Sequence, residues 1–159
     1  MPSESSDSNP PPPVPFNPTT WYQLKNSHLP STHSLDVVND NGHDSLGLLK
    51  IARDGYYAGQ YWQFNLKSDG TTHALRTWWL GPNRLLDVYA RDMSSTQILL
   101  PARETPGQCW KVEGWGDGTW QISNGLSSDE GLCCLDTVEE EGGVTVKMNA
   151  VDAERLLQR

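Results

Sequence analysis

The stretch "YYAGQYWQF" at residues 56–64 contains a four-residue motif, Gly-Gln-x-Trp, that occurs twice in the chain. Gly-Gln-Tyr-Trp at 59–62 recurs as Gly-Gln-Cys-Trp at 107–110, which is 48 residues later. The dipeptide Leu-Asp occurs three times at intervals of 51 and 49 residues, at 35–36, 86–87 and 135–136. Self-similarity at a fixed period of this length indicates a repeat architecture.

The spacing between the two motifs predicts a third copy. In the first two copies the Gln follows the Asp by 24 and 21 residues, at Gln60 and Gln108. Counting 22 residues from Asp136 reaches Gln158, and the sequence ends one residue later. We therefore expect three repeats, the last of them without its final strand, at about 21–70, 71–118 and 119–159.

The pattern of apolar, polar and turn-forming residues within the repeats predicts an all-β fold. Short runs such as "YWQFNL" and "VTVKM" alternate apolar and polar residues, and turn-forming clusters such as "SDG" and "WGDG" separate them. This pattern is typical of many short antiparallel strands, and no window shows a sustained helical period. Three units of about four strands predict a β-trefoil, closed around a pseudo-threefold axis. In it, Trp62 and Trp110 would anchor the core, with each repeat's Leu pointing inward and its Asp outward.

The first 18 residues differ from the rest of the chain. They hold seven of the eleven Pro, together with Ser, Asp and Glu. Such a stretch buries too little apolar surface to fold, so we predict a disordered tail at 1–18 and a folded domain at 19–159. A PxxP-type ligand for a partner's aromatic groove is the alternative interpretation of the tail.

Composition limits the classes of partner and the cellular compartments that are expected for the protein. The chain has 159 residues and a formal net charge of −8, which argues against nucleic acid and anionic lipid as partners. No apolar run approaches the roughly 18 residues of a membrane span, so no membrane insertion is expected. The start of the chain lacks the basic and apolar regions of a signal peptide. These features predict a cytoplasmic or unconventionally secreted protein.

The Leu-Asp and Gln-x-Trp motifs resemble those of the ricin B-chain type lectins, the QxW β-trefoil carbohydrate-binding family, in particular its fungal members. The resemblance covers residues 21–159. It implies sugar binding at up to three shallow sites. In the family the repeat Asp accepts hydrogen bonds from sugar hydroxyls, the Gln helps to hold the Asp, and an aromatic ring stacks on the sugar. The carbohydrate-binding residues implied by the motifs are Asp36, Gln60, Asp87, Gln108 and Asp136.

Other ligand positions of the family are altered in this chain. The stacking ring should lie about ten residues before each Gln, where the chain has Lys50-Ile51, Leu99-Leu100 and Lys147-Met148. The residue before the Gln, often Asn in sugar-binding repeats, is Gly59, Gly107 and Leu157. These departures leave the predicted fold intact and weaken the prediction of sugar binding.

Nearby residues offer substitutes in two repeats. Tyr57, with Tyr56 beside it, precedes Gln60 closely enough to supply a relocated ring, and Asn39 adds a polar group on the turn after Asp36. The alternative for the two Tyr is that they simply pack on a loop. In the second repeat Tyr89 follows Asp87 by two residues, which places it on the same face of the strand.

No motif predicts catalysis, a metal site or a cofactor. "NDNGHD" at 39–44 fails as a calcium loop, because Val37 and Leu48 would stand where acidic ligands belong. The cysteines and histidines lack zinc-binding spacings. The resemblance therefore implies a non-catalytic lectin module, with galactose-type glycans, the family's commonest ligands, as partners. The alternatives are a trefoil protein-interaction module that has lost sugar binding, for example a protease inhibitor, or a carbohydrate-binding appendage of a larger enzyme.

Overall fold

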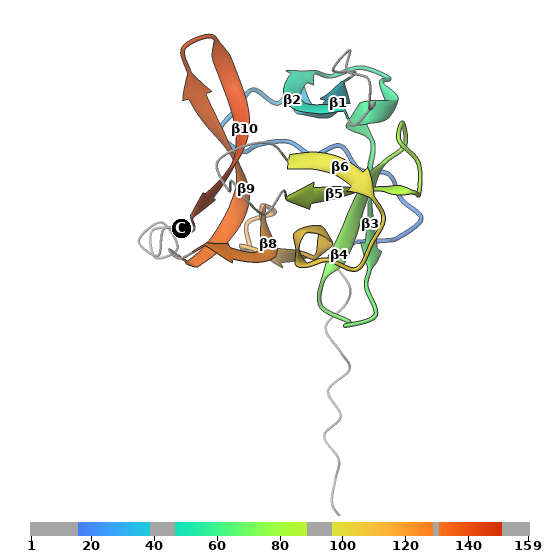
Figure 1. Cartoon of the computed structure of the whole chain (residues 1–159). Coiled ribbons are helices and arrows are strands. Elements are labelled where there is room, and N and C mark those ends of the chain that lie inside the picture. The colour runs from blue at the N-terminus through green and yellow to red at the C-terminus, as the bar shows by residue number, and fades with distance from the viewer. Residues whose placement is uncertain (1–15, 39–46, 89–96, 129–130, 151–159) are drawn as a thin grey trace, which may run out of the picture.

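The structure, a computed structural model, describes residues 16–38, 47–88, 97–128 and 131–150. In these ranges all strand pairs are antiparallel, and the only helical elements are two single 3-10 turns (Figure 1). The predicted all-β class is therefore confirmed. No helix within the described ranges has the length and apolar character needed to cross a membrane.

Three hairpins repeat along the chain. The first joins β1 (His33–Val38) to β2 (Leu48–Arg53), and the second joins β5 (Arg84–Val88) to β6 (Gln97–Pro101). The third, β9 (Gly131–Glu140) with β10 (Gly143–Ala150), is longer and extends away from the rest of the molecule (Figure 1). The remaining strands are β3 (Trp62–Leu66), β4 (His73–Thr77), β7 (Trp110–Gly114) and β8 (Trp120–Ser128).

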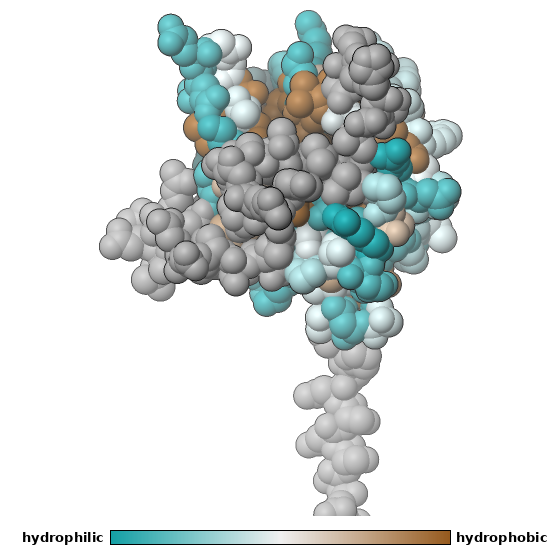
Figure 2. Space-filling model, in the orientation of Figure 1, coloured by the Kyte–Doolittle hydropathy of each residue, from teal (hydrophilic) through white to brown (hydrophobic). Residues whose placement is uncertain are grey.

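The hairpins carry the sequence repeat in matching positions. Each Leu-Asp lies on the first strand of its hairpin, and the Asp is paired with Lys50, Ile98 or Lys147 on the second strand. The second strands contact one another pairwise, β2 with β6, β6 with β10, and β10 with β2. Between the first and third hairpins the surface is apolar (Figure 2). The period seen in the sequence is therefore also present in the strand pairing.

The sheets are not closed into a barrel within the described residues. One sheet has six strands in the order β10-β9-β8-β7-β4-β3, and the first two hairpins form separate two-stranded sheets. The run at 21–25 contributes one isolated bridge between Tyr22 and Trp62. The region around Gln158 lies outside the described residues.

The two Trp of the Gln-x-Trp motifs are core anchors, as predicted. Trp62 and Trp110 are both 0% exposed. Each indole Nε1–H donates to the backbone oxygen of the Leu in its own repeat, Leu35 or Leu86, over 3.0 Å. A buried indole N–H needs such an acceptor, so each Trp ties its strand to the Leu-Asp hairpin.

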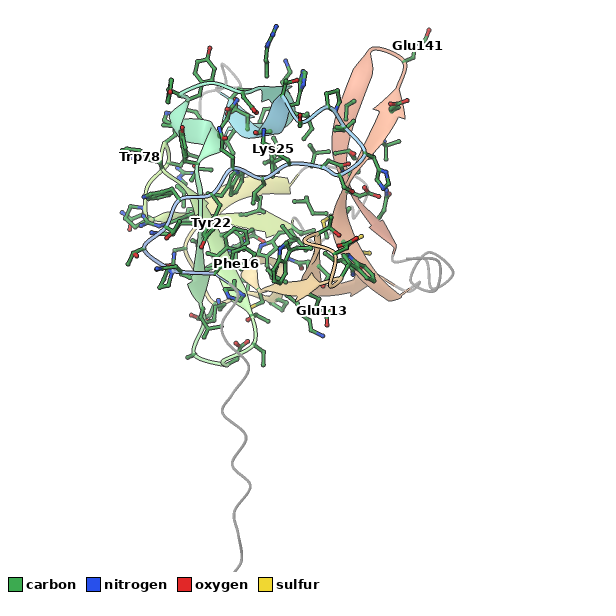
Figure 3. The ribbon with its side chains drawn as sticks, turned by 180° about the vertical axis from the view of Figure 1, so that it is seen from behind. Phe16, Tyr22, Lys25, Trp78, Glu113 and Glu141 are labelled. Atoms are coloured by element: carbon green, nitrogen blue, oxygen red, sulfur yellow. The ribbon has the colours of Figure 1, made fainter. Side chains whose placement is uncertain are left out.

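The ring of Phe16 packs against other aromatic side chains. Phe16 stacks on Phe64 with ring centroids 4.3 Å apart and meets Tyr22 edge-on at 5.3 Å (Figure 3). The centroid of the Trp120 ring lies 5.2 Å from that of Phe16, with the two ring planes inclined by 57°. Phe16 lies within the predicted tail of residues 1–18, and these contacts place its ring against the folded domain.

His73 is enclosed by this aromatic cluster. Its side chain is buried on β4, and the rings of Phe16 and Phe64 meet it edge-on, each at 6.3 Å. Neither ring nitrogen has a hydrogen-bond partner in the described structure. Burial lowers the pKa of His73 from its ordinary value of 6.5, and the charge of Asp69 opposes this shift only in part. The folded state therefore disfavours the imidazolium.

Acidification is expected to destabilise the protein through His73. The unfolded chain takes up a proton on this ring as the pH falls through about 6.5, whereas the folded chain takes it up only at lower pH, so stability is lost over that window. In urea unfolding at about pH 7 and about pH 5, a His73→Leu variant should lose less stability than the wild type.

Equal pH dependence of the wild type and His73→Leu would contradict the assignment.

Candidate functional site

In the first repeat the Asp and the Gln of the motifs meet through one buried amide. Gln60, the last residue of η1 (Ala58–Gln60), is 0% exposed. Its Nε2 donates to Asp36 Oδ2 at 3.1 Å and to the backbone oxygen of Arg53 at 2.9 Å. Its Oε1 accepts the backbone N–H of Gly55 at 3.0 Å. The amide therefore joins β1, the end of β2 and the turn into β3.

One carboxylate oxygen of Asp36 is bonded to this amide, and little of the side chain is exposed. Asp36 is 5% exposed, and Asp87 in the second repeat is 1% exposed, so the predicted outward orientation is wrong for both. Burial raises the pKa of Asp36, and hydrogen bonds from Gln60 and from the Val37 backbone act in the opposite direction. A buried carboxylate is costly without a hydrogen-bond donor. The carboxylates can turn inward because the buried Gln supplies such a donor.

The second repeat builds the same arrangement. Gln108 ends η2 (Pro106–Gln108), and its Nε2 donates to Asp87 Oδ2 at 3.0 Å and to the backbone oxygen of Pro101 at 2.9 Å. Its Oε1 accepts the backbone N–H of Arg103 at 2.9 Å. The two repeats thus match bond for bond, which shows that the Asp–Gln pair is a structural unit of the repeat.

The Gly before each Gln is required by this close packing. An added Cβ at Gly59 would lie 2.2 Å from the Val37 oxygen and 2.5 Å from Asp36 Oδ1. At Gly107 it would lie 2.2 Å from Asp87 Oδ1. Where the resemblance led us to expect Asn, the backbone instead passes directly over the carboxylate.

The repeats differ in what stands beside the Asp. Five residues before the Gln, the first repeat has Gly55, and the ring of Tyr57 packs so closely against it that an added Cβ would lie 2.2 Å from the ring. At the matching position the second repeat has Arg103, whose Nη2 reaches Asp87 Oδ2 at 3.4 Å. The ring at Tyr57 is replaced there by Thr105. The first repeat therefore presents an aromatic surface, whereas the second covers its Asp with a cation.

In the third repeat an Asn side chain donates to the Asp. Asp136 is partly buried, accepts the backbone N–H of Thr137 at 2.8 Å, and accepts Asn149 Nδ2 at 3.2 Å. Because β9 and β10 form one hairpin, this amide comes from the partner strand. Gln158, which the sequence predicts for the position, lies outside the described residues.

The structure brings together some of the predicted site residues. Asp36 and Gln60 bond directly, Tyr57 joins them through Gly55, and Asp87 bonds Gln108. Tyr56 is 99% exposed, whereas Tyr57 is 62% exposed. The predicted residues Asn39 and Tyr89 lie outside the described residues.

Arg103 was missed at the sequence level. Arg103 and Gly55 both stand five residues before their Gln, so an alignment of the two repeats on Gln-x-Trp places them at one position. That alignment shows a charge in one copy and no side chain in the other. It does not show that the charge reaches the Asp, which depends on the fold.

The described part of the chain offers little for metal chemistry, because no three His, Cys, Asp or Glu side chains gather there in a way that could hold an ion. The first-repeat site has an oriented carboxylate, a buried amide and an exposed phenol ring. Such a set suits hydrogen bonding and ring stacking.

Comparisons of the chain with protein-family models, with curated proteins and with solved structures found no match.

Proposed function

We propose that the chain is a non-catalytic carbohydrate-binding module of the ricin B-type, with its working site in the first repeat. The observation that carries the proposal is the ring of Tyr57, which is 62% exposed and held over Gly55 beside the Asp36–Gln60 pair. A flat ring takes up the C–H face of a sugar, and a nearby oriented acceptor fixes its hydroxyls.

A trefoil architecture is part of the proposal. Three hairpins with matching Asp positions, second strands in mutual contact and two equivalent Trp anchors support a pseudo-threefold arrangement. The tie from each Trp to its own Leu-Asp hairpin is the same in both copies. Under this proposal each repeat has the backbone arrangement of a sugar site, but only some repeats have the side chains that binding requires.

The second repeat is proposed to be inactive. Asp87 is 1% exposed, and Arg103 and Gln108 both contact its Oδ2. An acceptor whose oxygen is already shared by two donors has less to offer a sugar hydroxyl. With Thr105 in place of a ring, this repeat also lacks the stacking surface.

Replacing Tyr57 with Ala is expected to weaken glycan binding about tenfold, because one aromatic contact is worth that order of affinity. The measurement is a glycan array, followed by titration with the best glycan. Tyr56→Ala is the matched control, since Tyr56 is 99% exposed and its ring contacts nothing in the described structure. It should bind as the wild type does.

A blank array from folded wild-type protein would contradict the proposal. Equal losses for the two Tyr variants would instead show that the site lies elsewhere. Galactose-type glycans are the first candidates because of the resemblance alone, and the array tests them beside the others.

A protein-interaction module is the second candidate function. The observation that favours it is the burial of both Asp36 and Asp87, whose side chains the fold itself uses. Under this alternative the motif residues are retained for stability. Protein capture without any glycan binding would support it.

A further inference from the structure

Three aromatic side chains gather on the outside of the β3–β4 hairpin. Trp78, which follows β4, is 61% exposed. Its ring stacks on Trp21, with centroids 5.8 Å apart and planes inclined by 22°, and Tyr61 meets it edge-on at 6.2 Å. We call Trp21, Tyr61 and Trp78 the aromatic platform. Figure 3 shows Trp78 at the edge of the molecule, away from Phe16 and Tyr22.

The platform is fixed to the same turn that carries the first-repeat site. The Trp78 backbone N–H donates to the Tyr61 oxygen at 3.0 Å, and the Trp79 N–H donates to the Ala58 oxygen at 3.2 Å. Ala58 begins η1, and Gln60 ends it. The backbone at Trp78 and Trp79 and the Asp36–Gln60 pair are therefore held to the same short turn, which suits a ligand longer than one sugar.

A cation accompanies the platform. The guanidinium carbon of Arg76 lies 5.2 Å from the centroid of the Trp21 ring, and its Nε donates to Gln63 Oε1 at 2.7 Å. In the described part of the chain no carboxylate pairs with Arg76, although the protein carries a net charge of −8. Arg103, by contrast, is paired with Asp87. The Nη donors of Arg76 face no acceptor of the described protein and suit an anionic group.

We propose that the aromatic platform and Arg76 bind a second sugar unit that carries a carboxylate. The ligand is then an acidic oligosaccharide, with one unit at Tyr57 and Asp36 and the acidic unit on Trp78. This inference rests on the proposed function. It follows from the pairing of an exposed, fixed ring with a guanidinium, which matches the apolar face and the charge of such a unit.

The experiment uses an array of matched glycan pairs, each a neutral oligosaccharide with and without a terminal sialic or uronic acid. The wild type should bind the acidic member about tenfold more tightly, as a charge-assisted hydrogen bond predicts. In Arg76→Gln and in Trp78→Ala the ratio of acidic to neutral binding should fall to about one. Lys111→Gln removes a cation that is paired with Glu113 at 2.9 Å, and it should keep the wild-type ratio.

The possible results separate the two proposals. Equal binding of neutral and acidic members by the wild type overturns this inference and leaves the proposed function standing. An acidic preference that survives both Arg76→Gln and Trp78→Ala also overturns it. No binding of any glycan by folded protein overturns both.

Discussion

Replacing Gln60 with Leu is expected to destabilise the fold by about 3 kcal/mol, because a buried carboxylate loses its side-chain partner. Gln60 donates to Asp36 and to the Arg53 oxygen and accepts from Gly55, and Leu can make none of these bonds. Gln108→Leu should cost less, since Arg103 still reaches Asp87. Urea unfolding followed by circular dichroism measures both differences.

The pH dependence gives this prediction a second signature. Burial already raises the pKa of Asp36, and the Gln60 hydrogen bond opposes that rise, so the variant should raise the pKa further. A raised pKa means that the folded state binds more protons than the unfolded one, so stability falls as the pH rises through the folded pKa. Gln60→Leu should therefore lose more stability at about pH 7 than at about pH 4.5.

The double variant Asp36→Leu/Gln60→Leu provides the control. Replacing both members of a buried polar pair by apolar groups leaves no unpaired charge, so the double variant should be more stable than Gln60→Leu alone. Additive losses in the two single variants and the double variant would show that the pair is not coupled. That result would contradict the role assigned to the amide.

The sequence predicted the repeat but not the direction of its Asp side chains. Period, turn clusters and alternation are properties of the backbone pattern, so the all-β class and the Trp anchors followed from them. Alternation along a strand placed Asp36 outward, because the apolar Leu35 next to it was expected to point inward. The buried amide of Gln60 overrides that rule, and it comes from 24 residues away along the chain.

The same limit applies to the candidate site and to the tail. Tyr57 could be named from its nearness to Gln60, but only the fold shows that its ring lies on Gly55. The aromatic platform brings together Trp21, Tyr61 and Trp78, which lie far apart in the sequence and share no local motif. Phe16 sits among Pro-rich neighbours, and composition assigned it to the tail. Its stacking on Phe64 is a tertiary contact that composition cannot show.

Replacing Trp110 with Ala is expected to cost about 3–5 kcal/mol, the usual loss for truncating a large buried ring. Trp110 is 0% exposed, its backbone on β7 pairs with that of His73 on β4, and its indole N–H donates to the Leu86 oxygen at 3.0 Å. Such a loss is a large share of the roughly 5–15 kcal/mol that stabilises a domain, so Trp110→Phe should also be measured. Phe keeps most of the apolar contact but leaves the Leu86 oxygen without its donor, so a loss of about 1–3 kcal/mol of stability is expected.

Trp78→Ala, which removes a ring that is 61% exposed, should cost less stability than Trp110→Ala. Equal losses for Trp78→Ala and Trp110→Ala would contradict the view that the motif Trp holds each repeat to its hairpin.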